Sequence, residues 1–197
     1  MGINLIVGLG NPGSDYAQTR HNAGFWFADT LARSQGASFK LESKFQADVC
    51  KLSLLRSDGA RQECWLLKPA TFMNRSGQAV ASLAGFYKIP TMNILVIHDD
   101  LDLPTGTVRI KQGGGHGGHN GLRDLIAHLG DDFLRLRIGI GHPGKGNDVV
   151  GYVLNRPSKP EDALIHDAMD DALTVLPHMV GDDLEKAMHQ LHSRTGS

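Results

Sequence analysis

Apolar positions along this chain follow two periods, so that short apolar runs alternate with longer segments of helical spacing. Ile3–Leu9 is an apolar run typical of a strand buried on both faces. Apolar side chains recur at helical spacing from Asn22 to Gln35, and again from Asn74 or Ser76 until Pro90. Further strands are predicted at Phe45–Leu52, Glu63–Leu67, Ile94–Ile97, Val108–Lys111 and Leu134–Ile140.

The second half of the chain adds three predicted helices. Leu122 to Leu129 follow helical spacing behind a glycine-rich loop, with Asn120 in the position of the N-cap. Ser158–Glu161 is a capping box that opens another helix, and Leu184 to Leu191 form the apolar stripe of the last one. Strands interleaved with helices predict an α/β protein, a three-layer α/β/α sandwich around a mixed, largely parallel twisted sheet. We expect residues 1–197 to form a single domain.

Composition narrows the class of protein. Of the 197 residues, 41% are hydrophobic and 21% are charged, which is typical of a globular protein. No segment approaches the ~20 apolar residues of a membrane span, and no signal peptide is visible. Cys50 and Cys64 lack partners at metal-binding spacing and are interpreted as buried, reduced thiols. These features predict a cytoplasmic protein without membrane contact.

The net charge of −1 conceals an uneven distribution along the chain. Lys and Arg outnumber Asp between Pro104 and Lys145, and four histidines lie in the same stretch. From Glu161 to Glu185 there are eight acids and no Lys or Arg. A local basic surface can bind an anionic partner while the rest of the protein stays acidic. Two ordinary solvated faces of opposite charge would give the same count.

The glycine-rich loop is the strongest indication of a binding site. Six of the nine residues Gly113–Gly121 are glycine, and a helix follows. Backbone N–H groups at a helix start bind phosphate or carbonyl oxygens well. A flexible linker is the alternative, as is a metal site formed by His116 and His119, although no third ligand is evident.

Gly8–Gly13 matches the dinucleotide fingerprint G-x-G-x-x-G and follows a strand. That fingerprint requires a helix at its third glycine and an acid after a second strand. Here Pro12 precedes the third glycine, and Asp29 falls inside the first helix. Asn11 is better interpreted as a polar side chain at the carboxyl edge of the sheet, where α/β proteins bind ligands.

A histidine and an acid are candidates for general-base catalysis. His21 lies at the start of the first helix, and the helix N-terminus is expected to lower its pKa and favour the neutral ring. Asp99, after the Ile94–Ile97 strand, is the preferred acid for orienting that ring, with Asp100 and Asp102 as alternatives. The chain has no G-x-S-x-G elbow and no cysteine beside a base, which disfavours a covalent nucleophile.

Three asparagines lie at the ends of predicted strands or the starts of predicted helices: Asn11, Asn74 and Asn120. An amide offers a donor and an acceptor without charge, which suits a peptide backbone or an ester carbonyl. Asn74 and Asn120 could instead be no more than helix N-caps.

Six collinear motifs spanning nearly the whole chain resemble those of the bacterial peptidyl-tRNA hydrolases. Two departures are Asp100, where a glutamate is expected, and Arg75, where an apolar residue is common. The motifs are Gly8–Gly13, Thr19–Gly24, Thr71–Asn74, His98–Pro104, Gly113–Leu122 and Arg137–Pro143.

The resemblance implies hydrolysis of the ester between a peptide and the 3′-terminal ribose of tRNA. His21 would be the general base and Asp99 its partner, while Asn11, Tyr16, Asn74 and Asn120 would bind the substrate. Lys111 and Arg137, with Arg109 and Arg135 as lesser candidates, would contact tRNA phosphates. The resemblance implies no metal, no cofactor and a monomer. A catalytically idle RNA-binding module and a nucleotide-dependent oxidoreductase remain the alternatives from other classes.

Overall fold

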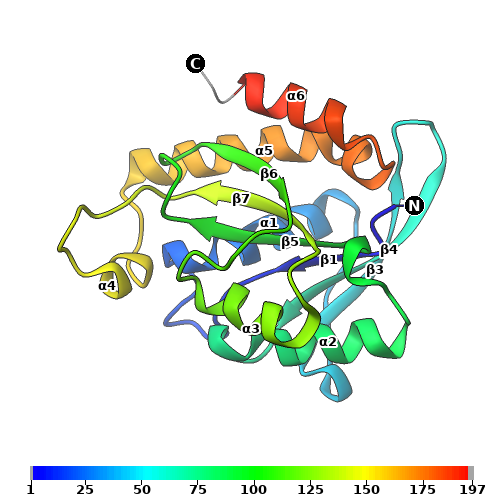
Figure 1. Cartoon of the computed structure of the whole chain (residues 1–197), viewed down its shortest axis with the longest axis horizontal. Coiled ribbons are helices and arrows are strands. Elements are labelled where there is room, and N and C mark those ends of the chain that lie inside the picture. The colour runs from blue at the N-terminus through cyan, green and yellow to red at the C-terminus, as the bar shows by residue number, and fades with distance from the viewer. Residues whose placement is uncertain (1, 195–197) are drawn as a thin grey trace.

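Seven strands form a single sheet in the structure, a computed structural model that describes residues 2–194 (Figure 1). Their order across the sheet is β2-β3-β4-β1-β5-β7-β6. The strands are β1 Leu5–Gly8, β2 Lys40–Glu42, β3 Ala47–Leu55, β4 Arg61–Pro69, β5 Ile94–Asp100, β6 Val108–Gln112 and β7 Leu134–Gly139.

The centre of the sheet is parallel and its edges are antiparallel. β4, β1, β5 and β7 run in the same direction, whereas β2, β3 and β6 pair with antiparallel neighbours. Gly8, at the end of β1, is opposite Ile97 of β5, so the segments that follow these two strands leave from the same edge. The predicted mixed sheet is therefore confirmed, and Asn11 follows β1 while Asp99 lies near the end of the neighbouring strand β5.

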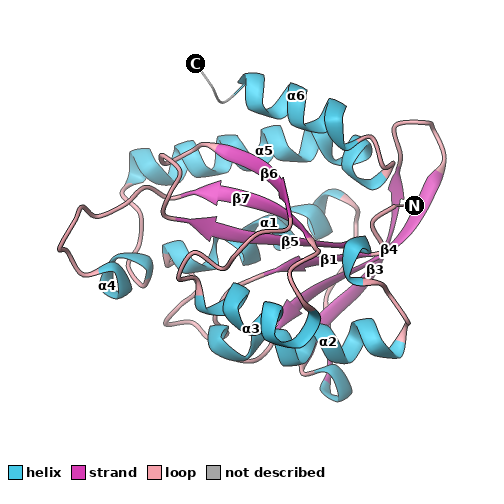
Figure 2. Cartoon of the chain, in the orientation of Figure 1, coloured by secondary structure: helices cyan, strands magenta, loops and turns pink. Residues whose placement is uncertain are grey.

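Helices cover both faces of this sheet (Figure 2). Ile6 of β1 packs in the core with α1, α5 and α6, whereas Leu5 and Val7 pack in the core with α2 and α3. This alternation confirms the predicted three-layer arrangement. The α-helices in the described residues are α1 Ala23–Ser34, α2 Ser76–Phe86, α3 Asn120–Leu129, α4 Val149–Val153, α5 Lys159–Val180 and α6 Leu184–Arg194.

Two short elements, one helix start and one strand start differ from the sequence prediction. β2 and α4 have three and five residues, too few to show a strand or helix period. Asn120 is the first residue of α3 and not its N-cap, which is His119. The strand expected from Phe45 begins at Ala47, because Phe45 ends the 3-10 helix η2 (Ser43–Phe45) and Gln46 follows it with a φ of 52°.

Candidate active site

A cleft of about 370 Å³ opens at the carboxyl end of β5, between the glycine-rich loop and α4. Two histidines and a carboxylate, His21, His119 and Asp99, contribute to its wall, together with the basic residues Lys111 and Arg137. These residues come from separate segments of the chain, and the fold brings them together.

Close packing at the start of α1 places His21. This histidine lies in the 3-10 helix η1 (Arg20–Asn22), which leads directly into α1. A Cβ on Gly24 would lie 2.4 Å from the carbonyl oxygen of Ile97, and one on Gly8 would lie 2.3 Å from that of Gly24. The first turn of α1 therefore rests directly on the ends of β1 and β5, which only glycines permit.

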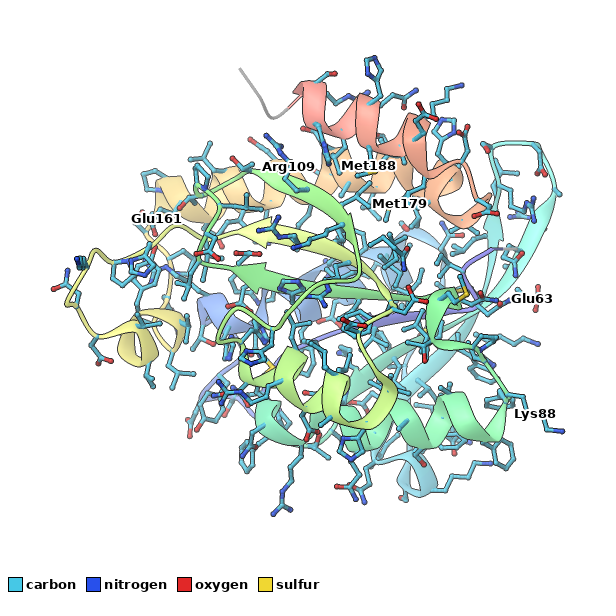
Figure 3. The ribbon with its side chains drawn as sticks, viewed as in Figure 1. Glu63, Lys88, Arg109, Glu161, Met179 and Met188 are labelled. Atoms are coloured by element: carbon cyan, nitrogen blue, oxygen red, sulfur yellow. The ribbon has the colours of Figure 1, made fainter. Side chains whose placement is uncertain are left out.

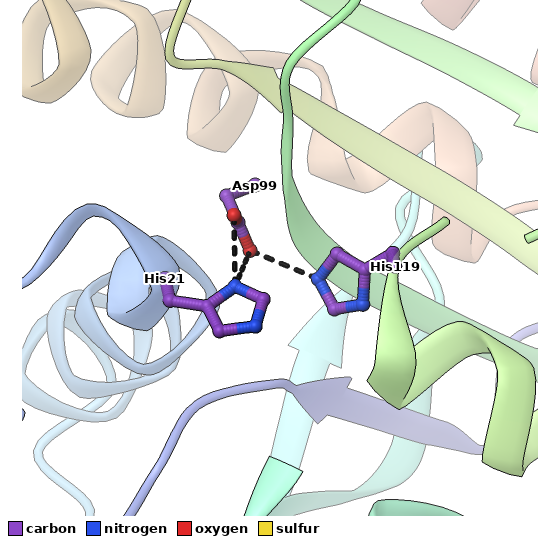
Figure 4. A group of neighbouring side chains, drawn as sticks. All are labelled: His21, Asp99 and His119. Carbon is purple, nitrogen blue, oxygen red and sulfur yellow. Dashed lines mark hydrogen bonds and ion pairs between the residues drawn. The ribbon is translucent and has the colours of Figure 1, made fainter. Parts of the chain in front are cut away.

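The ring of His21 meets the carboxylate of Asp99 through Nδ1, at 2.9 and 3.0 Å from the two oxygens (Figure 4). A carboxylate can only accept hydrogen bonds, so in the neutral ring the proton is on Nδ1 and the lone pair is on Nε2. His21 lines the cleft, and Nε2 has no hydrogen-bond partner within residues 2–194. Nε2 is therefore the atom that can accept a proton from water.

The charges of this pair depend on each other. Burial alone would lower the pKa of His21, but the charge of Asp99 and the hydrogen bond to it outweigh burial and raise this pKa. The expectation that the helix N-terminus lowers it is wrong, because the nearby carboxylate has the larger effect. Burial would raise the pKa of Asp99, yet His21 and His119 hold it well below its usual range. Asp99 thus stays ionised and can stabilise a protonated His21.

His119 connects Asp99 to the start of α3. Its Nδ1 accepts hydrogen bonds from the backbone N–H groups of Gly121 and Leu122, at 3.1 and 3.3 Å, and so caps the helix. The proton of the neutral ring is therefore on Nε2, which donates to Oδ1 of Asp99 at 2.9 Å. The sequence suggested His119 only as a metal ligand, because histidine is not a usual N-cap and its partner Asp99 is 20 residues away.

Another buried histidine, His98, lies beside the ring of His119. Its Nδ1 donates to the backbone carbonyl oxygen of Asp99 at 2.8 Å, and its Nε2 is buried without a partner among the described residues. Burial, with the neighbouring His119 ring, lowers the pKa of His98 to about 4. His98 therefore stays neutral at physiological pH, and it adds no positive charge beside His119.

The four residues expected to bind substrate lie at different depths. Asn120 lines the cleft, whereas Asn74 is exposed in the 3-10 helix η3 (Met73–Arg75) and Tyr16 is half-buried. Asn11 is buried, and its Oδ1 accepts a hydrogen bond from the backbone N–H of Met73 at 2.7 Å. Asn11 thus connects the turn after β1 to the segment that carries Asn74. Contact of these four residues with the substrate stays a prediction.

The basic residues of the cleft have distinct surroundings. Lys111 is exposed, and its Nζ lies 2.9 Å from where a Cβ on Gly114 would stand, so its side chain follows the glycine-rich loop. Nε of Arg137 donates to Asp100 at 2.7 Å. Arg135, a lesser candidate for phosphate contact, is buried and donates to backbone carbonyl oxygens of the glycine-rich loop, which it holds against β7.

Almost the whole chain is similar to known sequences. The sequence pattern of the peptidyl-tRNA hydrolase family matches residues 5–197. A peptidyl-tRNA hydrolase of Neisseria gonorrhoeae is 56% identical over 193 residues, which are 98% of each chain. Those of Methylobacillus flagellatus and Coxiella burnetii are 54% and 52% identical, again over 98% of both chains.

This chain belongs to the peptidyl-tRNA hydrolase family.

The fold agrees with this assignment. A crystal structure of peptidyl-tRNA hydrolase from Acinetobacter baumannii superimposes with a TM-score of 0.90 at 49% identity, over 96% of this chain and 94% of the other. The resemblance drawn from the sequence motifs is confirmed, and the chain is a hydrolase that acts on peptidyl-tRNA. In the described residues of this hydrolase, no helix is long and apolar enough to cross a membrane.

The structure also tests the metal alternative. His21, Asp99 and His119 bring their ligand atoms within 4.8 Å of one another, but His116 is not part of this group. Nδ1 of His116 accepts a hydrogen bond from the backbone N–H of Gly118 instead. Because Nδ1 of His119 accepts two N–H groups, its Nε2 carries a hydrogen and offers no lone pair to a cation. The group suits proton transfer better than metal binding.

Two of the three glycines of the dinucleotide fingerprint, Gly8 and Gly10, serve packing. A Cβ on Gly8 would overlap Gly24, and one on Gly10 would lie 2.6 Å from the ring of Phe25. The helical segment begins at Arg20, well after Gly13, and Asp29 forms an ion pair with Lys68. The helix that a dinucleotide site requires at its third glycine thus does not begin there, and Asp29 is paired within the fold, which argues against an oxidoreductase.

Proposed function

We propose that this chain releases peptides from tRNA by general-base catalysis, with His21 as the base and water as the nucleophile. The observation that carries the proposal is the His21–Asp99 pair, which directs a free Nε2 to the cleft. Water would attack the ester carbonyl that joins the peptide to the 3′-terminal ribose. The products are the free peptide and a reusable tRNA.

Each proton in this reaction has a place. Nε2 of His21 takes a proton from the attacking water, and the ionised Asp99 stabilises the resulting imidazolium. When the tetrahedral intermediate collapses, the same Nε2 returns the proton to the leaving 3′-oxygen of the ribose. The reaction balances with water alone, so it requires no cofactor and no metal.

Amide groups near the cleft are suited to the negative charge of the intermediate. Asn120 lines the cleft, and the side-chain oxygen of Asn11 is already bonded to Met73. Only Nδ2 of Asn11 is therefore left to face a substrate carbonyl. We assign substrate binding to Asn11, Tyr16, Asn74 and Asn120, with one or more of the amides donating to the oxyanion.

The surroundings of the cleft suit the acceptor end of a tRNA. Lys111 and Arg137 line it and would neutralise phosphates. We propose that the enzyme acts as a monomer in the cytoplasm, where it returns tRNA from aborted translation.

Hydrolysis of two substrates, after exhaustive EDTA treatment, tests the proposal. N-acetyl-aminoacyl-tRNA should be cleaved at an unchanged rate, whereas free aminoacyl-tRNA should be a poor substrate. The free α-amino group is charged, and it would lose hydration where a peptide amide would bind. Loss of activity that zinc restores would contradict the metal-free reaction. Binding of tRNA with the ester left intact would indicate an RNA-binding module.

A further inference from the structure

Arg20 directly precedes the proposed base and reaches the segment that carries α4. Only 8% of this arginine is exposed. Its Nη1 donates to the carbonyl oxygens of Tyr152 and Asn155, at 3.0 and 3.4 Å, and its backbone N–H donates to Asn155 as well. Its Nη2 forms an ion pair with Glu161 at 2.9 Å. Glu161 lies at the end of α5 that is nearest to the α4 segment (Figure 3).

Stability alone does not explain this burial. Removing a guanidinium from water costs free energy that one partly exposed carboxylate offsets only in part. Nε of Arg20 is also buried without a partner in the described structure. The arrangement instead connects Arg20 rigidly to the α4 segment. The planar guanidinium lies 4.0 Å from the ring centre of Tyr152 and donates to oxygens of three residues.

The position of α4 depends on few other hydrogen bonds. Three valines of this helix line the cleft as an apolar wall, Val149, Val150 and Val153. Val150 is 66% exposed, so burial of this end of α4 is slight, and Val153 is the valine of the helix that reaches the core. Among the described residues, hydrogen bonds from residues 148–155 to the rest of the chain involve Arg20 and the Tyr152 hydroxyl, which donates to Ile140 at 2.6 Å.

We propose that Arg20 is a positioning residue that holds α4 beside the cleft, where its three valines contact the peptidyl part of the substrate. The inference rests on the proposed function. His21 keeps its own place without Arg20, because Asp99 holds its ring and the Asn22 side chain bonds the backbone of Asn11 in both directions. Loss of Arg20 therefore lowers the fraction of molecules with α4 in place. The apparent affinity for the substrate falls in proportion to that fraction, while the rate of the chemical step is unchanged.

Two variants of Arg20 and a matched control test this role. Arg20→Lys keeps the charge but loses the planar fork, and Arg20→Gln loses both. In each, amide hydrogen exchange in residues 150–155 and the KM for N-acetyl-aminoacyl-tRNA should rise about 3- to 10-fold, with kcat within about twofold of wild type. Arg33→Lys should change neither value, because Arg33 is exposed on α1 and, within residues 2–194, its side chain bonds only Thr30 of the same helix.

Tyr152→Phe provides a milder test, since it removes one hydroxyl and leaves Arg20 in place. It should raise both the exchange of α4 and KM. Unchanged exchange in the Arg20 variants would overturn the positioning role. So would a fall in kcat at constant KM, which simple loss of folded enzyme would give. Hydrogen exchange reports on α4 whether or not His21 is the base, so failure of this inference and failure of the proposed reaction are distinguishable.

Discussion

At the scale of single residues, one carboxylate sets the proton affinity of the proposed base. Asp99 accepts hydrogen bonds from His21 and His119, and it raises the pKa of His21 against the effect of burial. The rate should therefore fall as the pH drops through this raised pKa, because Nε2 is then already protonated.

Asp99→Asn should move this acid limb to lower pH. Without the negative charge, burial has the larger effect and lowers the pKa of His21. The plateau rate should also fall, by about 10²–10⁴-fold, since the imidazolium loses its countercharge. The profile of kcat/KM against pH in both enzymes measures both effects. An acid limb that stays in place would mean that Asp99 does not set the pKa of the base.

The residue types of this pair could be predicted from the sequence, but the sign of the pKa shift could not. Both His21 and Asp99 follow predicted strands or begin a predicted helix, so their position at one edge of the sheet follows from topology. The shift depends on how far Asp99 is buried and on its contact with His21, which are properties of the packed structure.

At the scale of elements, His119 caps α3 and holds Asp99 with the same ring. Two substitutions separate these roles. His119→Ala should lower the free energy of unfolding by about 1 kcal/mol, because the N-terminal N–H groups of α3 lose their acceptor. His119→Asn should recover most of that stability, since asparagine is a favourable N-cap. Neither variant retains the hydrogen bond to Asp99, so both should lose activity.

Urea denaturation and initial rates measure these two effects separately. If His119→Asn regains stability together with full activity, the bond to Asp99 is dispensable and the ring serves only as a cap. Equal stability of wild type and His119→Ala would contradict the capping role.

Elements with clear periodicity were predictable, and those without it were not. α1 and the buried central strands have long apolar patterns, so their existence follows from the sequence. α4 has five residues and exposes Val150, and it is held by Arg20 from a distant segment. No local pattern predicts an element whose position depends on such a contact.

At the scale of the whole molecule, part of the basic stretch between Pro104 and Lys145 lies in the cleft. Lys111 and Arg137 lie in the cleft, while Asp100 pairs with Arg137 at 2.7 Å. The sequence indicated a basic stretch here, but it could not reveal that part of this charge is already neutralised. Arg137 therefore both lines the cleft and neutralises the charge of Asp100.

This pairing predicts unequal effects on tRNA binding. Lys111→Ala should raise KM and reduce the salt dependence of binding by roughly one counterion or less, with kcat nearly unchanged. Arg137→Ala should raise KM further, because it also leaves Asp100 unpaired beside the phosphates. The double variant Arg137→Ala/Asp100→Asn should recover part of the loss.

Lys40→Ala is a charge-matched control, since Lys40 is exposed on β2 at the opposite edge of the sheet. A minimal ester without the acceptor stem should be cleaved equally well by all of these variants. Equal losses on that ester would place Lys111 and Arg137 in the support of the active site and exclude phosphate binding as their main role.

The most direct test of the account is the turnover of His21→Ala on N-acetyl-aminoacyl-tRNA. This substitution removes Nε2, the only atom assigned to proton transfer. With folding and tRNA binding retained, as circular dichroism and filter binding would show, kcat should fall by about 10²–10⁴-fold. Turnover near that of wild type would contradict the account, because the water would then be activated by another group.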